Sequence, residues 1–542
     1  MSHFPDPIAA GLARGWRVLD ASATGLPDEV DCDVAIVGTG AGGGITAEIL
    51  ARAGLRVLMI EEGPLKSSRD FDMRESEAYP QLYQESAARK TKDKAINILQ
   101  GRCVGGSTTV NWTSSFRTPA PTLAWWRERY GLGDFTPEAL FPWFEQAEHR
   151  LSIGPWLAPP NENNDLLRRG AARLGIPAPA ILRNVRGCLN LGYCGLGCPT
   201  NAKQSMLVTT VPAALDAGAT LYTRARASRL EIADGRVAAL EVQWLDAGGL
   251  RPGGRRTQVR ATHFVLSGGA INTPALLLRS QAPDPNRLVG ARTFLHPTIV
   301  SAASFEQRVD GFEGAPQTIY SDFFLDGGPI DGPIGYKLEA PPIHPVLYAT
   351  TLHGFGPVHA QRMKDFAHTH ALLALLRDGF HPQAAGGRVE VRRDGSPVLD
   401  YPLTDYVFDG ARRALLSMAE IQFEAGARVV YPVHELADGY RSWPEARAAI
   451  GALPMKPLLL RVVSAHVMGG CPIAADAGRG VVQPDGVHWQ LANLSVHDGS
   501  LFPTSIGANP QLSVYGITAR LASGLAARLT GRQSSGLLDA AA

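Results

Sequence analysis

The chain has 542 residues, of which 45% are hydrophobic and 19% charged, and its formal net charge is +1. This composition is ordinary for a water-soluble globular protein of two or three domains, and the charge gives no reason to expect nucleic acid as a partner. No apolar run approaches the ~20 residues of a membrane span, and the N-terminus lacks a secretory signal pattern. We therefore expect a cytoplasmic protein without a transmembrane segment.

Residues 1–30 are expected to form an N-terminal arm, and residues 33–63 predict a dinucleotide-binding unit. Residues 34–37 are mostly β-branched, which is typical of a buried parallel strand. A glycine turn, a helix over 45–53 and a second strand over 56–60 follow. This order of strand, turn, helix and strand is the context in which a glycine motif binds a nucleotide.

Gly38, Gly40 and Gly43 form a G-x-G-x-x-G motif. The first glycine permits a tight turn, the second lets the backbone approach a pyrophosphate, and the third allows the helix to pack closely on the strand. Glu61 follows the second strand, at the place where a carboxylate binds the adenosine ribose. A glycine-rich loop in another α/β protein is the alternative, and the choice between NAD and FAD stays open at this point.

A second glycine loop follows residues 66–99, which are polar and charged and which we expect to form a surface excursion. Gly105, Gly106 and Ser107 offer backbone N–H groups without obstruction by Cβ atoms, which suits a phosphate or the edge of a flat ring. Asn111 can both donate and accept hydrogen bonds. Taken alone, such a loop is more often structural than functional.

Three of the six cysteines cluster in one loop, at Cys188, Cys194 and Cys198. Their spacing matches no zinc-finger pattern, and no fourth ligand lies nearby in the sequence, so no metal is expected. We favour plain packing thiols for this loop. A disulfide or redox pair is the second interpretation, and a metal site is the third.

The middle of the chain predicts three further elements. Residues 265–280 indicate a strand followed by a helix that starts near Asn272 or Thr273, with Pro274 in its first turn. The other two elements are a hairpin over 388–393 and 397–401 and an amphipathic helix over 409–424.

The last part of the chain contains a histidine, His466, in the segment V-V-S-A-H-V-M-G-G-C. The segment V-H-D-G-S-L-F-P-T-S-I-G-A-N-P-Q-L-S-V follows and contains Asp498, Asn509 and Gln511. A single histidine between apolar residues is more often a core residue than a functional one, so its context decides the interpretation.

Together these segments resemble the glucose–methanol–choline (GMC) family of FAD-dependent oxidoreductases. The resemblance spans nearly the whole chain and rests on five motifs in the family's order: the N-terminal fingerprint, G-R-C-V-G-G-S-T-T-V-N, S-G-G-A-I-N-T-P-A-L-L-L-R-S, S-A-H-V-M-G-G-C and D-G-S-L-F-P-T-S-I-G-A-N-P. The loop C-G-L-G-C-P-T-N-A-K-Q-S is similar to one in long-chain alcohol oxidases and in a bacterial subgroup of GMC dehydrogenases.

The resemblance implies an α/β fold with a Rossmann-like FAD-binding domain built from discontinuous segments. It also implies an inserted α+β substrate-binding domain with an antiparallel sheet. We expect the FAD-binding domain over 31–120, 216–300 and 461–535, and the substrate-binding domain with its insertions over 121–215 and 301–460.

By resemblance, His466 is the catalytic base and Asn509 the second catalytic residue, while Asp498 contacts the ribityl chain. Histidine suits a general base because its pKa lies near neutrality. FAD is expected to be bound non-covalently, because Val110 stands where flavinylated relatives have a histidine. The expected cofactor-binding residues are Gly38, Gly40, Gly43, Glu61, Gly105, Gly106, Ser107, Asn111, Asp498 and Gln511.

The implied reaction is oxidation of a small-molecule alcohol to an aldehyde or ketone, with hydride transfer to flavin N5. The electron acceptor is either O2 or a quinone or cytochrome partner. Two other functions stay open: a non-redox lyase that keeps FAD as a structural group, and a flavoprotein subunit that delivers electrons to a partner protein. Asn509 also precedes a helix, where its side chain could serve only as a cap.

Overall fold

The structure is a computed structural model that describes residues 4–537, so residues 1–3 of the expected N-terminal arm lie outside it. Its largest sheet has the strand order β1-β8-β3-β2-β11-β10-β9, and β22 also pairs with β11. The bounds are β1 Arg17–Asp20, β2 Glu29–Val37, β3 Val57–Ile60, β8 Thr220–Thr223, β9 Ala225–Ala233, β10 Arg236–Leu245, β11 Pro252–Leu266 and β22 Leu494–Val496. Strands β1, β8, β3, β2, β11 and β22 pair in parallel, whereas β9, β10 and β11 form an antiparallel meander.

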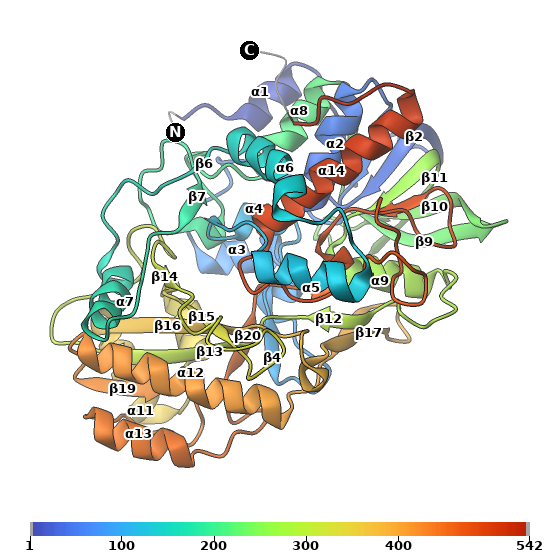
Figure 1. The fold of residues 1–542 in the computed structure, drawn as a ribbon. Coiled ribbons are helices and arrows are strands. Elements are labelled where there is room, and N and C mark those ends of the chain that lie inside the picture. Colours follow the sequence, from blue (N-terminus) through green and yellow to red (C-terminus); the bar gives the residue numbers. More distant parts are fainter. Residues whose placement is uncertain (1–3, 538–542) are drawn as a thin grey trace.

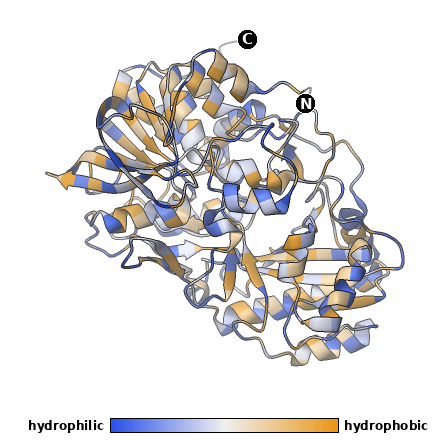
Figure 2. Ribbon diagram, turned by 180° about the vertical axis from the view of Figure 1, so that it is seen from behind, coloured by the Kyte–Doolittle hydropathy of each residue, from blue (hydrophilic) through white to orange (hydrophobic). Residues whose placement is uncertain are grey.

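Four helices group beside this sheet in the upper part of Figure 1. They are α2 Ala41–Arg52, α6 Pro137–Arg150, α8 Thr210–Asp216 and α14 Gln511–Thr530. Helix α2 packs against both α8 and α14, and α14 also packs against α6. The centre of β2, from Val34 to Ile36, and all of β3 are buried, as expected for parallel strands covered on both faces. Figure 2 shows orange, hydrophobic segments within the strands of this sheet, together with blue, hydrophilic ones.

A second sheet has the order β14-β15-β16-β13-β20-β4, with β19 also paired to β13. The bounds are β4 Ile96–Ile98, β13 Thr298–Ser304, β14 Tyr320–Ser321, β15 Tyr336–Glu339, β16 Thr369–Leu376, β19 Val429–Pro432 and β20 Val462–Ser464. Its pairs are antiparallel except β20 with β4. Helix α12, Asp405–Glu424, packs on this sheet, and α7 Glu162–Arg173 and α13 Trp443–Ala452 pack on α12 (Figure 1).

Two smaller sheets complete the strands. One has the order β18-β17-β12-β21, with bounds Pro397–Asp400, Gly387–Val391, Ala291–Phe294 and Met468–Gly469; the other is β5-β7-β6, with bounds Ser114–Ser115, Leu182–Asn184 and Ile153–Gly154. The remaining helices are α1 Pro7–Ala13, α3 Glu75–Leu82, α4 Ser107–Val110, α5 Ala120–Tyr130, α9 Gly269–Arg279, α10 Pro345–Thr351 and α11 Gly356–Lys364, with 3-10 turns at Gln84–Ala87, Cys194–Leu196, Phe366–His368, Pro382–Ala384 and Gly499–Leu501. Within residues 4–537, no helix has the length and apolar character needed to cross a bilayer.

The predicted α/β class, the strand–turn–helix–strand unit, the hairpin and the long amphipathic helix are confirmed. The start of α9 was predicted wrongly. The helix begins at Gly269 and Pro274 lies inside it, because the carboxylate of Asp498 accepts the N–H of Gly269 and fixes the first turn there. That contact comes from a distant segment, so the local sequence did not show it.

The stretch 66–99 is also not only a surface excursion. Strand β4 pairs with β20 in the second sheet, and its Ile96 and Ile98 are fully buried. Arg89 is buried as well. The charged residues around this segment hid a short apolar strand, whose alternation over three residues is too brief to predict. The expected division into two discontinuous domains stays a prediction.

Candidate active site

A cavity of about 760 Å³ lies at the carboxyl ends of β2, β3 and β11, and it extends to residues of the second sheet. Ligands of parallel α/β sheets bind at this edge. The cavity is lined by Gly38 and Gly40 from the first glycine turn and by His466 and Asn509 from the C-terminal segments. Residues more than 400 positions apart therefore face one space.

The three motif glycines have different surroundings. Gly38 has a φ of +94°, and a Cβ atom there would collide with the carbonyl oxygen of Ser267. A Cβ atom on Gly40 would meet only the Cα of Gly106, at 3.7 Å. Gly43 is not among the residues that line the cavity, and its Cβ atom would collide with the carbonyl oxygen of Gly38. Gly38 and Gly43 thus serve packing, while Gly40 leaves room for a ligand.

Glu61 is buried at the cavity edge, and both of its carboxylate oxygens accept hydrogen bonds from the protein. One oxygen accepts from the N–H (3.1 Å) and the hydroxyl (2.7 Å) of Thr39, and the other accepts from the N–H of Gly63 (2.9 Å). Burial raises the pKa of Glu61. The carboxylate therefore holds the glycine turn in shape, and a ribose at this place would share its oxygens with Thr39 and Gly63.

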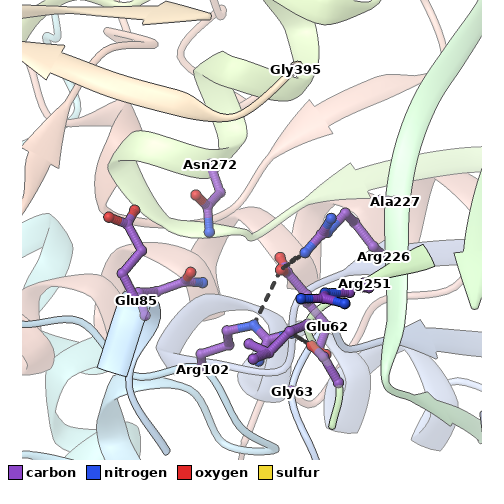
Figure 3. A network of polar contacts seen from close by, with 12 residues as sticks. Glu62, Gly63, Glu85, Arg102, Arg226, Ala227, Arg251, Asn272 and Gly395 are labelled. Carbon is purple, nitrogen blue, oxygen red and sulfur yellow. Dashed lines mark hydrogen bonds and ion pairs between the residues drawn. The ribbon is translucent and has the colours of Figure 1, made fainter. Parts of the chain in front are cut away.

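Glu62 also lines the cavity, and the sequence interpretation missed it. Figure 3 shows its carboxylate between Arg226 and Arg102, with N–O distances of 2.9 and 3.1 Å. Burial alone would raise the pKa of Glu62, but the two guanidinium groups outweigh it and lower the pKa to about 2. The sequence feature that could have pointed to Glu62 is its position as a second acidic residue directly after β3.

The second glycine loop contributes Gly106, Ser107 and Asn111 to the cavity lining. Gly105 is not among the lining residues, and its N–H donates to the hydroxyl of Thr39 at 3.0 Å. The side chain of Asn111 donates to Gln511, which also lines the cavity, at 2.6 Å. The loop thus connects the first glycine turn with the start of α14.

Asp498 lines the cavity as expected, whereas the neighbouring His497 does not. The carboxylate of Asp498 accepts from the N–H of Gly269 (2.8 Å) and from the hydroxyl of Thr273 (2.6 Å). His497 is buried on the other side, with its Nδ1 3.0 Å from the hydroxyl of Thr46. Adjacent residues of an extended segment point to opposite faces, which separates the two.

These residues fit the ADP half of a dinucleotide. The cavity end between the two glycine loops is free of Cβ atoms at Gly40 and Gly106, so a pyrophosphate can approach the backbone. Helix α2 begins there, so its free N–H groups and the positive end of its dipole face the cavity. Two acidic side chains, Glu61 and Glu62, follow where the ribose hydroxyls of the nucleotide are expected.

At the other end of the cavity, His466 is paired with a second histidine. The Nδ1 atoms of His466 and His296 lie 3.2 Å apart, and the two rings are edge to face. His296 is fully buried, and its Nε2 accepts the backbone N–H of Gly507 at 3.1 Å. The backbone N–H groups of Leu295 and His296 donate to Asp378, which fixes this turn.

Burial and the nearby charge of Lys337 lower the pKa of His466 to about 3. The His466 ring is therefore neutral at about pH 7, which is the form in which a histidine can act as a base. Sequence reasoning also missed His296, which no motif pointed to and which reaches His466 only through the fold.

Asn509 lies in the cavity lining and does not cap α14, whose first turn has no side-chain cap. Its Oδ1 accepts from Lys337 Nζ at 2.9 Å, and its Nδ2 donates to Glu339 Oε2 at 3.2 Å. Lys337 and Glu339 are themselves paired at 3.0 Å, and both are buried. Burial lowers the pKa of Lys337 to about 8. The capping role considered for Asn509 is thus absent from the structure.

Near His466 and Asn509, the cavity wall is largely apolar. The side chains that form this wall are Val110, Trp112, Leu373, Leu375 and Val463. Trp112, Leu373, Leu375 and Val463 pack into one hydrophobic cluster. This end can therefore hold a hydrocarbon group beside two polar groups.

The three clustered cysteines are free thiols in half-buried positions. Within the described part of the chain, no group of three or more His, Cys, Asp or Glu side chains could hold a metal ion. The loop instead braces the second glycine loop, because the Lys203 ammonium donates to the carbonyl oxygens of Thr109, Asn111 and Cys194 at 2.5, 3.1 and 2.7 Å.

Comparison of the chain with known proteins gives matches to one family. Residues 79–298 match the N-terminal model and residues 382–518 the C-terminal model of the family described as GMC oxidoreductase. An uncharacterised GMC-type oxidoreductase of Sinorhizobium fredii is 28% identical, over 91% of this chain and 94% of its own length. A long-chain-alcohol oxidase of Arabidopsis thaliana is also 28% identical, over 90% of this chain and 66% of its own length.

Among solved structures, pyridoxine 4-oxidase from Mesorbium loti superposes with a TM-score of 0.68. The match covers 91% of this chain and 98% of that protein, at 20% sequence identity. At this identity, the likeness is one of fold.

Proposed function

Because the chain belongs to the GMC oxidoreductase family, we propose that it catalyses the FAD-dependent oxidation of an alcohol CH–OH group to an aldehyde or ketone. One observation carries the proposal: His466 and Asn509 face the same cavity as the two glycine loops. A cofactor bound at the two glycine loops and extending along the cavity would lie next to a substrate held by His466 and Asn509.

FAD, when bound, supplies the hydride acceptor. Gly40, Gly106 and Ser107 would hold its pyrophosphate through the backbone, and Glu61 with Glu62 would face its ribose. Asn111, Asp498 and Gln511 line the middle of the cavity and would contact the remainder. Val110 offers no nucleophile at the position that the flavinylated relatives use, so we propose non-covalent binding.

His466 would take the hydroxyl proton as the general base, since an alcohol carbon gives up a hydride only as that proton leaves. Asn509 Nδ2 has two hydrogens, and Glu339 uses one. The other would donate to the developing alkoxide, in the manner of an oxyanion hole.

The apolar wall formed by Trp112, Leu373, Leu375 and Val463 supports an alcohol with a hydrocarbon chain. The name of the plant relative, a long-chain-alcohol oxidase, points to the same substrate class and to O2 as the acceptor. We propose a primary alcohol of intermediate or long chain as the substrate.

The test is anaerobic mixing of the FAD-loaded protein with primary alcohols of increasing chain length. The flavin absorbance near about 450 nm should be bleached, and the apparent affinity should rise with each added CH₂. Product formation with permanently oxidised flavin would instead select a lyase. If no alcohol bleaches the flavin and no product forms, the proposed function is wrong.

A further inference from the structure

The hydrogen bonds around His296 determine where its proton lies. A backbone N–H can only donate, so the N–H of Gly507 makes Nε2 of His296 an acceptor without a proton. A neutral imidazole carries one proton, which must then be on Nδ1. This Nδ1–H points at Nδ1 of His466, 3.2 Å away.

The same reasoning then fixes the tautomer of His466. Its Nδ1 accepts the proton of His296, so its own proton must be on Nε2. A doubly protonated His466 would place two N–H groups against each other, and a doubly protonated His296 would place its Nε2–H against the N–H of Gly507. Both rings are therefore neutral, in agreement with the lowered pKa that burial gives each.

In the described residues, no protein group hydrogen-bonds Nε2 of His466, and the residue lines the cavity. The nitrogen left for a ligand thus carries a proton in this arrangement. A nitrogen in that state donates a hydrogen bond to a substrate oxygen, but it cannot accept a proton from it.

We propose that His296 is a positioning residue that sets the tautomer of His466, and that its hydrogen bond from Gly507 must open before His466 can act as a base. This inference rests on the proposed function, because it concerns the same base.

The change between the two forms conserves protons. In the base-competent form, His466 carries its proton on Nδ1 and donates it to Nδ1 of His296, and His296 carries its own proton on Nε2. His466 Nε2 loses one proton to water and His296 Nε2 gains one from water, while the proton between the rings moves across. Gly507 and Asn509 belong to one short loop, so substrate binding at Asn509 acts on the backbone that holds His296.

Two substitutions of His296, to residues of nearly equal size, should favour different tautomers of His466. In His296→Gln, an amide can accept from Gly507 and donate to His466, so Nε2 of His466 should stay protonated. In His296→Glu, a carboxylate only accepts, so it should draw the proton of His466 to Nδ1 and leave Nε2 free. Both variants remove the same ring, and the Glu variant also buries a carboxyl group, so its folding is checked separately by its FAD content.

The readout is the ¹⁵N spectrum of histidine-labelled, FAD-loaded protein without substrate at about pH 8, which lies about four units above the ordinary pKa of a glutamate carboxyl group and so allows for the rise that burial causes. Protonated and unprotonated imidazole nitrogens resonate far apart, and the His466→Gln variant identifies the signals of His466. We expect a protonated Nε2 in the unsubstituted protein and in His296→Gln, and a protonated Nδ1 in His296→Glu. Alcohol should then reduce the Glu variant at least ~10-fold faster than the Gln variant.

The proposal is overturned if His466 of the unsubstituted protein carries its proton on Nδ1, or if the Gln and Glu variants show the same tautomer. The spectrum of the unsubstituted protein decides even if the Glu variant does not fold. If the predicted tautomers are seen but no alcohol reduces the flavin, the tautomer assignment stands and the proposed function fails.

Discussion

Lys337 and Glu339 fix the orientation of the Asn509 side-chain amide. An ammonium group only donates and a carboxylate only accepts, so Oδ1 must face Lys337 and Nδ2 must face Glu339. The ammonium also lies 3.0 Å from the ring centroid of Phe116, which favours a buried cation. The ion pair thus keeps an N–H of Asn509 available to the cavity.

Removing this ion pair as a unit should lower the rate of flavin reduction without unfolding the protein. The double variant Lys337→Met with Glu339→Gln leaves no unpaired buried charge, so we expect a stability change of only about 1–2 kcal/mol. The amide that replaces the Glu339 carboxylate can both donate and accept hydrogen bonds, so the Asn509 amide can flip by about 180° and lose its fixed orientation. Stopped-flow reduction by alcohol should slow on the order of 10-fold, less than the ~10²–10³-fold loss expected for Asn509→Ala.

The control for this prediction is the same pair of changes in an Asn509→Ala background, where they should have little further effect. A double variant that reduces as fast as the unsubstituted protein would show that the orientation of Asn509 does not depend on the ion pair.

Among the helices, strands and turns, those that depend on contacts between residues close in the sequence were predicted correctly. The glycine turn, α2 and the hairpin depend on short-range glycine, β-branched and turn residues, and each was found in place. Lys337 and His296 could not be predicted, because they belong to β15 and to the turn before β13 and reach the site only through sheet pairing. The predicted start of α9 was wrong for the same reason, because the contact with Asp498, far along the chain, fixes where the helix begins.

The first glycine turn gives a prediction that separates cofactor binding from packing. Gly40→Ala should leave the free energy of unfolding of the FAD-free protein nearly unchanged, because its φ is −70° and the nearest atom to a Cβ is 3.7 Å away. FAD affinity should fall at least ~10-fold, because the Cβ atom would occupy the approach of the pyrophosphate. Fluorescence titration of the stripped protein with FAD measures this.

Gly54→Ala is the matched control, since its Cβ atom would meet nothing within 4 Å and it does not line the cavity. It has a φ of +86°, so it should cost about 1 kcal/mol of stability and leave FAD affinity unchanged. Equal FAD affinity in Gly40→Ala and the unsubstituted protein would remove Gly40 from the proposed binding site.

Across the whole molecule, the site is a product of two sheets whose strands come from both halves of the chain. The parallel sheet supplies the glycine turn, and the antiparallel sheet supplies the ion pair that holds Asn509. Burial also keeps several histidines of the molecule neutral. Burial lowers the pKa of five histidines to about 3 or 4: His263, His370, His466, His488 and His497.

These histidines predict a loss of stability in mild acid. Below the ordinary pKa of 6.5, the unfolded chain binds protons that the folded chain does not, so the free energy of unfolding falls as the pH falls. Each such group contributes a slope of about 1.4 kcal/mol per pH unit. Denaturant midpoints measured between about pH 7.5 and about pH 5.5 should therefore decrease.

His263→Gln removes one of these groups outside the cavity lining and should make the decrease shallower. Midpoints that stay constant or rise toward about pH 5.5 would mean that the buried carboxyl groups with raised pKa, such as Glu61 and Asp378, dominate instead.

In the proposed reaction, His466 takes the alcohol proton in a cavity that binds FAD at its other end. The most direct test of this step is the single-turnover rate of anaerobic flavin reduction by a primary alcohol in His466→Ala, with the FAD content measured in the same sample. We expect an unchanged FAD content and a rate lower by ~10² or more, because the general base is lost. A rate within about twofold of the unsubstituted protein, at equal FAD content, would contradict it.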